Sequence, residues 1–173
     1  MVAATCLAAC LAACTQPVRS FEPDRNADQL DDVGFLHYLP TVPVVTVAEG
    51  SRAVLMLLEP HENRTTHDAR WNELLRRGAV KDPWNLRPEQ IMDMGTLAHM
   101  LCVICAAPPS INQRIAAAGG FGDRRYALHT AAHEGLLPYA RAHAPVTGGE
   151  LLSALQRAEQ YRQSDTGSRA QVP

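Results

Sequence analysis

Two closely spaced pairs of residues are the first candidates for chemistry in this sequence. Cys102 and Cys105 form a Cys-x-x-Cys motif, a spacing used by redox and metal sites. His129 and His133 lie four residues apart and so share one face of a helix, with Glu134 beside them, in a geometry suited to a divalent metal. One function to weigh is therefore that of a metal-binding or thiol-redox protein.

Both pairs lack a part that such chemistry needs. Redox versions of Cys-x-x-Cys place the first thiol at a helix N-terminus, where the helix dipole lowers its pKa, but Cys102 and Cys105 fall inside an apolar run. His129 is followed by Thr130, not by the glutamate of zinc proteases, and no third ligand is evident. The favoured interpretations are core packing for the cysteines and a solvated helix flank for the histidines.

The remaining sequence carries no motif of a known reaction, so we expect a non-catalytic protein without a cofactor. Nucleophile-elbow and phosphate-loop patterns are absent, and the glycines at 119–122 follow no predicted strand. With 16 basic and 18 acidic side chains the net charge is -2, and lysine and arginine form no run. Nucleic acid is therefore not an expected partner.

The elements that must position these residues are helices. Met94 to Ala107 has apolar side chains at helical spacing around most of its surface, which predicts a buried central helix capped by Asp93 and ended by Pro108. An alanine-rich composition with 5% aromatic residues favours helices over sheets. The predicted fold class is all-α, with about six helices in helix-loop-helix units around Met94 to Ala107.

Capping boxes mark two further helix starts. Thr46 is followed by Glu49, and Thr147 by Glu150, and apolar residues at helical spacing come after each. The segments 81–90 and 110–124 are expected to be loops. Helices are expected over 30–38, 46–59, 67–77, 94–107, 126–134 and 148–161.

The amino terminus carries a targeting signal. The segment before Cys14 is apolar and rich in small residues, and Leu-Ala-Ala-Cys occurs twice, ending at Cys10 and at Cys14. It resembles the lipobox of bacterial lipoproteins, although a positively charged start is missing. The resemblance implies an envelope lipoprotein whose membrane anchor is a lipid on Cys14. Thr15 and Gln16 after this cysteine imply the outer membrane.

Composition then divides the chain into four parts. Residues 1–14 are the lipoprotein signal segment, and 15–30, polar and without apolar periodicity, are expected to be a disordered tether. Residues 31–162 are the all-α domain. Residues 163–173 are polar and are expected to be a disordered tail.

An internal repeat is the strongest pattern in the domain. A helix ended by glycine, a loop and a capped helix recur, with Gly78 and Gly135 at an offset of 135 - 78 = 57 residues. The sequences VTVAE at 45–49 and VTGGELL at 146–152 resemble the Thr-Arg-Ala-Glu signature of the S-layer homology module. The resemblance implies about three repeats and a helical module that binds cell-wall polysaccharide.

The chain departs from that family at the arginine of the signature, which helps to hold anionic polysaccharide: Val47, Met94 and Gly148 stand at the matching positions. Binding is then expected to use aromatic and arginine side chains near helix starts, where rings stack on sugars and guanidinium groups hold carboxylates. Trp71 is left out of the predicted face, because a tryptophan at its helical spacing from Leu74 and Leu75 is more often a core residue. The expected partners are envelope polysaccharide or another envelope protein. The predicted binding face consists of Trp84, Arg87, Arg124, Arg125 and Tyr126.

Overall fold

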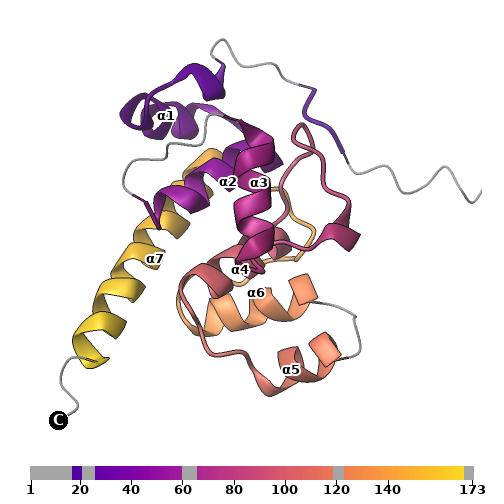
Figure 1. The fold of residues 1–173 in the computed structure, drawn as a ribbon, viewed down its shortest axis with the longest axis vertical. Helices are drawn as coiled ribbons and strands as arrows, with labels where there is room; N and C mark the ends of the chain where they lie inside the picture. Colours follow the sequence, from indigo (N-terminus) through magenta and orange to yellow (C-terminus); the bar gives the residue numbers. More distant parts are fainter. Residues whose placement is uncertain (1–16, 21–25, 60–65, 119–122, 170–173) are drawn as a thin grey trace, which may run out of the picture.

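The computed structural model describes residues 17–20, 26–59, 66–118 and 123–169, and Cys14 lies outside them. These residues form seven α-helices and three short 3-10 helices, with no strand among them (Figure 1), which confirms the all-α fold class. The α-helices are α1 (Asp32–Tyr38), α2 (Val47–Met56), α3 (His67–Arg76), α4 (Met94–Ile104), α5 (Ile111–Ala118), α6 (Asp123–His133) and α7 (Gly148–Arg169). The 3-10 helices are η1 (Ala27–Gln29), η2 (Leu39–Thr41) and η3 (Asp82–Trp84).

Three backbone hydrogen bonds form a closed ring inside the fold. The Val45 amide donates to the Val146 carbonyl at 2.8 Å, the Val146 amide to the Met92 carbonyl at 3.0 Å, and the Met92 amide to the Val45 carbonyl at 2.9 Å. All three residues are fully buried, so water cannot replace these bonds. The ring ties together three segments that are far apart in the sequence.

Each residue of this ring is followed at once by the N-cap of a helix. The Thr46 and Thr147 hydroxyls accept bonds from the amides of Glu49 (3.3 Å) and Glu150 (3.2 Å), and both glutamates accept a bond from the cap amide in return. Asp93 accepts a bond of 2.7 Å from an amide in the first turn of α4. Both predicted capping boxes and the predicted cap at Asp93 are confirmed, and α2, α7 and α4 start from the ring.

The first residue of each of these three helices is buried, because its amide donates to a carbonyl of a neighbouring segment. These bonds run from Val47 to Gln90 (2.8 Å), from Met94 to Ala144 (2.9 Å) and from Gly148 to Val42 (3.3 Å). At Gly148 a side chain would overlap the backbone of Leu39. The first amide of each helix thus has a backbone partner within the fold.

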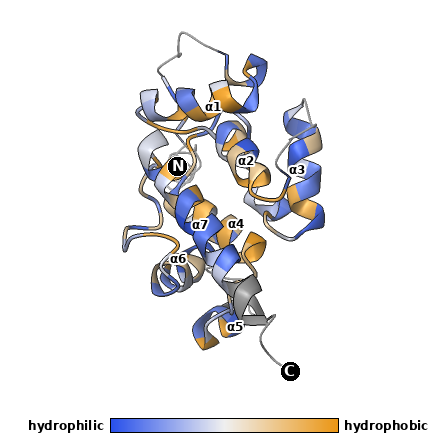
Figure 2. Ribbon diagram, turned by 90° about the vertical axis from the view of Figure 1, so that its left-hand side faces the viewer, coloured by the Kyte–Doolittle hydropathy of each residue, from blue (hydrophilic) through white to orange (hydrophobic). Residues whose placement is uncertain are grey.

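The predicted central helix is α4. Every residue from Met94 to Cys102 is buried, and α6 packs along it. The helix ends at Ile104, earlier than the predicted Ala107, because Ala106 takes a left-handed conformation with φ of 51°. Figure 2 shows apolar residues concentrated on α2 and α4, whereas α3 and α7 carry long polar stretches.

Two segments that were predicted without helix are helical. The expected loop 110–124 contains α5, which Ser110 caps through a bond of 3.2 Å from the Gln113 amide, and α6 begins at Asp123. Ile111 and Ile115 of α5 are exposed, so the burial pattern that marks a helix in sequence is missing there. The expected tail is helical as well, because α7 continues to Arg169.

The described parts of the expected tether, 17–20 and 26–30, pack on the domain. The Ile91 amide donates to the Pro17 carbonyl at 3.0 Å, and Arg19 pairs with the buried Glu49 at 2.8 Å. Arg52 donates to the carbonyls of Ala27 (2.6 Å) and Leu30 (2.7 Å). The sequence predicted a disordered tether here, whereas the structure holds these residues through Arg19 and Arg52 and packs Ala27 and Leu30 against the core.

Among the helices that the structure describes, none combines the length and the apolar character that a bilayer crossing requires. The longest of them, α7, carries charged residues along its course. Apolar side chains of α1, α2, α3, α4, α6 and α7 instead pack in one shared core.

We predict that Leu101→Ala lowers the free energy of unfolding by about 2–5 kcal/mol, because it leaves a cavity under a fully buried side chain of α4. Urea denaturation measures this change. The matched control is Ile115→Ala on α5, where the side chain is 68% exposed and the expected change stays within about 0.5 kcal/mol. Equal stability of the two variants would contradict the central role of α4.

Candidate functional site

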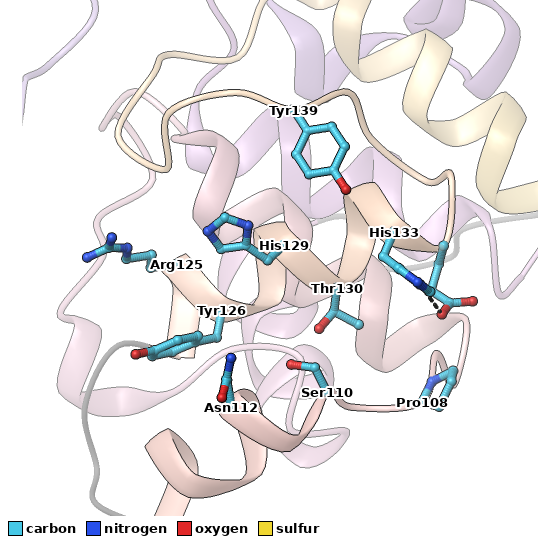
Figure 3. Close-up of a pocket in the computed structure, with 10 residues that line it drawn as sticks. Pro108, Ser110, Asn112, Arg125, Tyr126, His129, Thr130, His133 and Tyr139 are labelled. Atoms are coloured by element: carbon cyan, nitrogen blue, oxygen red, sulfur yellow. Dashed lines mark hydrogen bonds and ion pairs between the residues drawn. The ribbon is translucent and has the colours of Figure 1, made fainter.

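A pocket of about 620 Å³ lies between the start of α5, one face of α6 and the loop that follows α6 (Figure 3). Polar and aromatic side chains of both helices make up most of its wall. Its lining residues are Pro108, Ser110, Asn112, Arg125, Tyr126, His129, Thr130, His133, Glu134 and Tyr139.

The basic residues of the pocket form a line along α6, which we call the α6 stripe. Arg125, His129 and His133 are spaced by four residues, so they lie on successive turns of the same helix face. Ala127 and Ala131 on the opposite face are fully buried against α4. Packing on α4 therefore turns the stripe outward, and the His133 side chain is 82% exposed.

Two tyrosines stand on either side of the α6 stripe. Figure 3 shows Tyr139 above His129 and Tyr126 below it, next to Asn112. Tyr139 is 76% exposed, which is unusual for an aromatic ring. The position of α5 is fixed by a bond of 2.8 Å from the Thr130 hydroxyl to the side-chain oxygen of Gln113. The pocket thus combines open rings, cations and hydroxyl groups on a rigid helix pair.

Glu134 is the acidic residue of this pocket wall. Its carboxylate accepts a bond of 3.2 Å from the Tyr161 hydroxyl and lies 3.3 Å from Nδ1 of His133. Both oxygens thus have a partner within the protein.

The structure separates the predicted binding face into two places. Arg125 and Tyr126 line the pocket, but Arg124 turns the other way and donates to Asp93 at 3.2 Å and to Thr96 at 3.4 Å. The Arg124 guanidinium also lies 5.4 Å from the centre of the Trp84 ring. Arg124 and Trp84 therefore hold the start of α4 instead of opening toward the pocket.

Around Trp84 lies a second group of polar residues, which is largely buried. The His99 ring meets the Trp84 ring edge-on at 4.9 Å and bonds to the Gly78 carbonyl through Nε2 at 3.2 Å. Burial lowers the pKa of His99, so its ring is neutral near pH 7. Arg87, the remaining member of the predicted face, lies apart in the loop before α4 with 57% of its side chain exposed.

The cysteines of the Cys-x-x-Cys motif are buried thiols in the core. Both side chains are 4% exposed, and each sulfur faces a backbone carbonyl of another helix, Cys102 that of Ala127 at 3.5 Å and Cys105 that of Ala158 at 3.9 Å. Burial raises the pKa of Cys102 to about 12 and that of Cys105 to about 11. A redox or metal thiol needs the opposite shift.

The two histidines of the motif lie on the pocket wall without a third metal ligand. His129 and His133 share a face of α6, as their spacing predicts. Over the residues that the structure describes, no three histidine, cysteine, aspartate or glutamate side chains form a group that could hold a metal ion. Two imidazoles on one open helix face would leave most coordination positions of a metal ion to solvent.

Tyr139, Ser110 and Asn112 are the pocket residues that the sequence did not indicate. They come from loop sequence and from the start of α5, where no periodicity marks a buried or an exposed face. An aromatic residue directly after Pro138 in a polar loop was the available signal.

Comparisons with known proteins returned no match. No protein-family model matches the chain, and neither a curated protein nor a solved structure is similar to it. Its function must therefore be argued from the chemistry of its own sites.

We predict that an alkylating reagent modifies Cys102 and Cys105 at least about a hundredfold more slowly in the folded protein than in urea at pH 8, because the raised pKa values leave little thiolate. Peptide mapping by mass spectrometry measures both rates. Rapid modification of either thiol in the folded state would contradict the assignment of this pair to the core.

Proposed function

We propose that this protein is a non-catalytic lipoprotein of the cell envelope, a helical module that binds acidic envelope polysaccharide through the pocket between α5 and α6. The observation that carries the proposal is the α6 stripe, in which Arg125, His129 and His133 point outward between the exposed ring of Tyr139 and the half-buried ring of Tyr126. The ligand class follows from this chemistry. Rings stack on sugar faces, and an arginine holds a carboxylate through two parallel hydrogen bonds.

The position of the pocket is consistent with the departures from the S-layer homology signature. Val47, Met94 and Gly148, where that family carries its arginine, are buried, and backbone closes over the helix starts. A ligand cannot reach these positions. The exposed cations of α6 supply the charge that the signature positions lack.

The ring of Val45, Met92 and Val146 supports three related units. Each ring residue precedes a capped helix and takes the same donor and acceptor role. Three copies of one sequence unit that meet at a common point produce such an arrangement. The pocket is not repeated in the other copies, because α5 stands in the connection between α4, which ends one copy, and α6, which begins the next.

We predict that Arg125→Ala/His129→Ala/His133→Ala weakens the binding of purified cell wall by at least about tenfold, since a hydrogen bond to a charged group contributes about 1.5–3 kcal/mol. Binding of the unsubstituted protein should weaken as salt rises, because exposed charges are screened. Co-sedimentation with purified cell wall measures both effects.

The matched controls are Arg157→Ala on α7 and Arg87→Ala in the loop before α4, which remove exposed cations outside the pocket and should leave binding unchanged. Unchanged binding of the triple variant would refute the pocket as the site. If the protein captures a specific envelope protein and has no affinity for cell wall, the ligand is a protein and not a polysaccharide. A stoichiometric metal that is lost in His129→Ala would instead favour a metal-binding protein.

The anchor is the second part of the proposal, and it is supported by the lipobox-like sequence that ends at Cys14. We predict that cells expressing the protein incorporate a clickable fatty acid into it and that Cys14→Ser abolishes this incorporation. Cys10→Ser is the matched control, because the same Leu-Ala-Ala-Cys sequence ends there. Lipid labelling of Cys14→Ser at the level of the unsubstituted protein would disprove the anchor.

A further inference from the structure

The segment 17–20 is fixed to the domain by both backbone and side chain. The Ile91 amide donates to the Pro17 carbonyl at 3.0 Å, and Val18 forms an antiparallel bridge with Gln90. Arg19 follows directly and reaches into the domain. The segment is therefore attached to the loop before α4 along its length.

Arg19 is held by a buried carboxylate that has no alternative cation among its bonds. Glu49 is 4% exposed and accepts bonds from Arg19 at 2.8 and 2.9 Å and from the Tyr38 hydroxyl at 2.6 Å. Its second oxygen also accepts the Thr46 amide at 2.8 Å. Removing the arginine would leave a buried charge without its counter-charge, which is strongly unfavourable. The docked state of 17–20 is thus part of the stable fold.

Covalent geometry then limits the distance between the anchor and the domain. Cys14 precedes Pro17 by three residues, and a chain extends by at most about 3.6 Å per residue. The α-carbon of Cys14 lies within about 11 Å of that of Pro17. A lipid on Cys14 places this residue at the membrane surface. No free tether remains to hold the domain away from the lipid.

We infer that the domain rests directly on the bilayer that holds its anchor, with the surface formed by 17–20 and 87–91 facing the phospholipid headgroups. This inference rests on the proposed lipid on Cys14. Besides the largely buried Arg19, the charged side chains of this surface are Arg87 and Glu89, which pair at 3.5 Å and are both more than half exposed. Arg87 lies where it can meet lipid phosphate, which removes it from the polysaccharide face.

The opposite end of the molecule is the C-terminal end of α7. Figure 1 shows it at the far side of the fold from the segment 17–20. Gln163 lies near this end and is exposed. A probe at Gln163 and one at Glu89 therefore report on the two ends of an anchored domain.

The test uses the lipidated full-length protein, purified from membranes and placed in phosphatidylcholine vesicles that contain a lipid with a nitroxide on its headgroup. A fluorophore is attached to Glu89→Cys or, as the matched control, to Gln163→Cys. The native thiols of Cys102 and Cys105 are buried and take up little label. We expect the nitroxide to remove most of the emission at position 89 and little of it at position 163.

A second variant separates the anchor from the docked segment without touching the domain. Inserting about ten glycine and serine residues between Gln16 and Pro17 adds about 17 Å of reach. We expect this insertion to restore the emission at position 89. Equal quenching at positions 89 and 163, or quenching at 89 that survives the insertion, would overturn the inference while the lipid, verified by mass spectrometry, keeps the anchor intact. A protein without lipid would overturn the anchor and this inference together.

Discussion

The closed ring of backbone hydrogen bonds among Val45, Met92 and Val146 is the constraint on which the rest of the structure depends. A buried amide or carbonyl without a partner is strongly destabilising, and here each of the three segments satisfies the other two. Because a helix cap follows each ring residue directly, the ring also sets where α2, α4 and α7 begin and how they leave their common point.

Positions beside the ring are closed to solvent. The first residues of α2, α4 and α7 are buried there, whereas Arg125, His129 and His133 on the outer face of α6 are exposed and line a pocket. Neighbouring residues on a helix point about 100° apart, so Arg124 and Arg125 have different surroundings. One holds the cap of α4 through Asp93, and the other opens onto the pocket.

Local signals in the sequence account for much of this fold. Thr46 with Glu49 and Thr147 with Glu150 mark helix starts by the chemistry of four consecutive residues, and the apolar run of α4 marks burial without any partner being known. The ring itself was hidden from sequence analysis, because hydrogen bonds between backbone groups carry no side-chain signature. The repeat pattern indicated only that helix caps recur. Each residue of the ring lies one residue before a cap.

The parts that the sequence did not predict depend on partners far along the chain. In sequence, Arg19 looks like a residue of a solvated tether, and only the structure shows Glu49 beside it. A polar segment that is held by buried ion pairs cannot be told from a disordered segment by its composition. The apolar residues of α5 face solvent, so periodicity gives no helix there. The candidate site was therefore predictable in its α6 members, whose spacing is local, but not in Tyr139 or Ser110, which only the turn after α6 and the start of α5 bring to it.

The ring also governs when the chain can fold. Val45 and Val146 are 146 - 45 = 101 residues apart, and a loop of that length must close before the Val45 amide gains its bond to the Val146 carbonyl. Contacts of such high sequence separation form slowly and late. While the chain is being synthesised, the amide of Val45 has no native acceptor until residue 146 has left the ribosome.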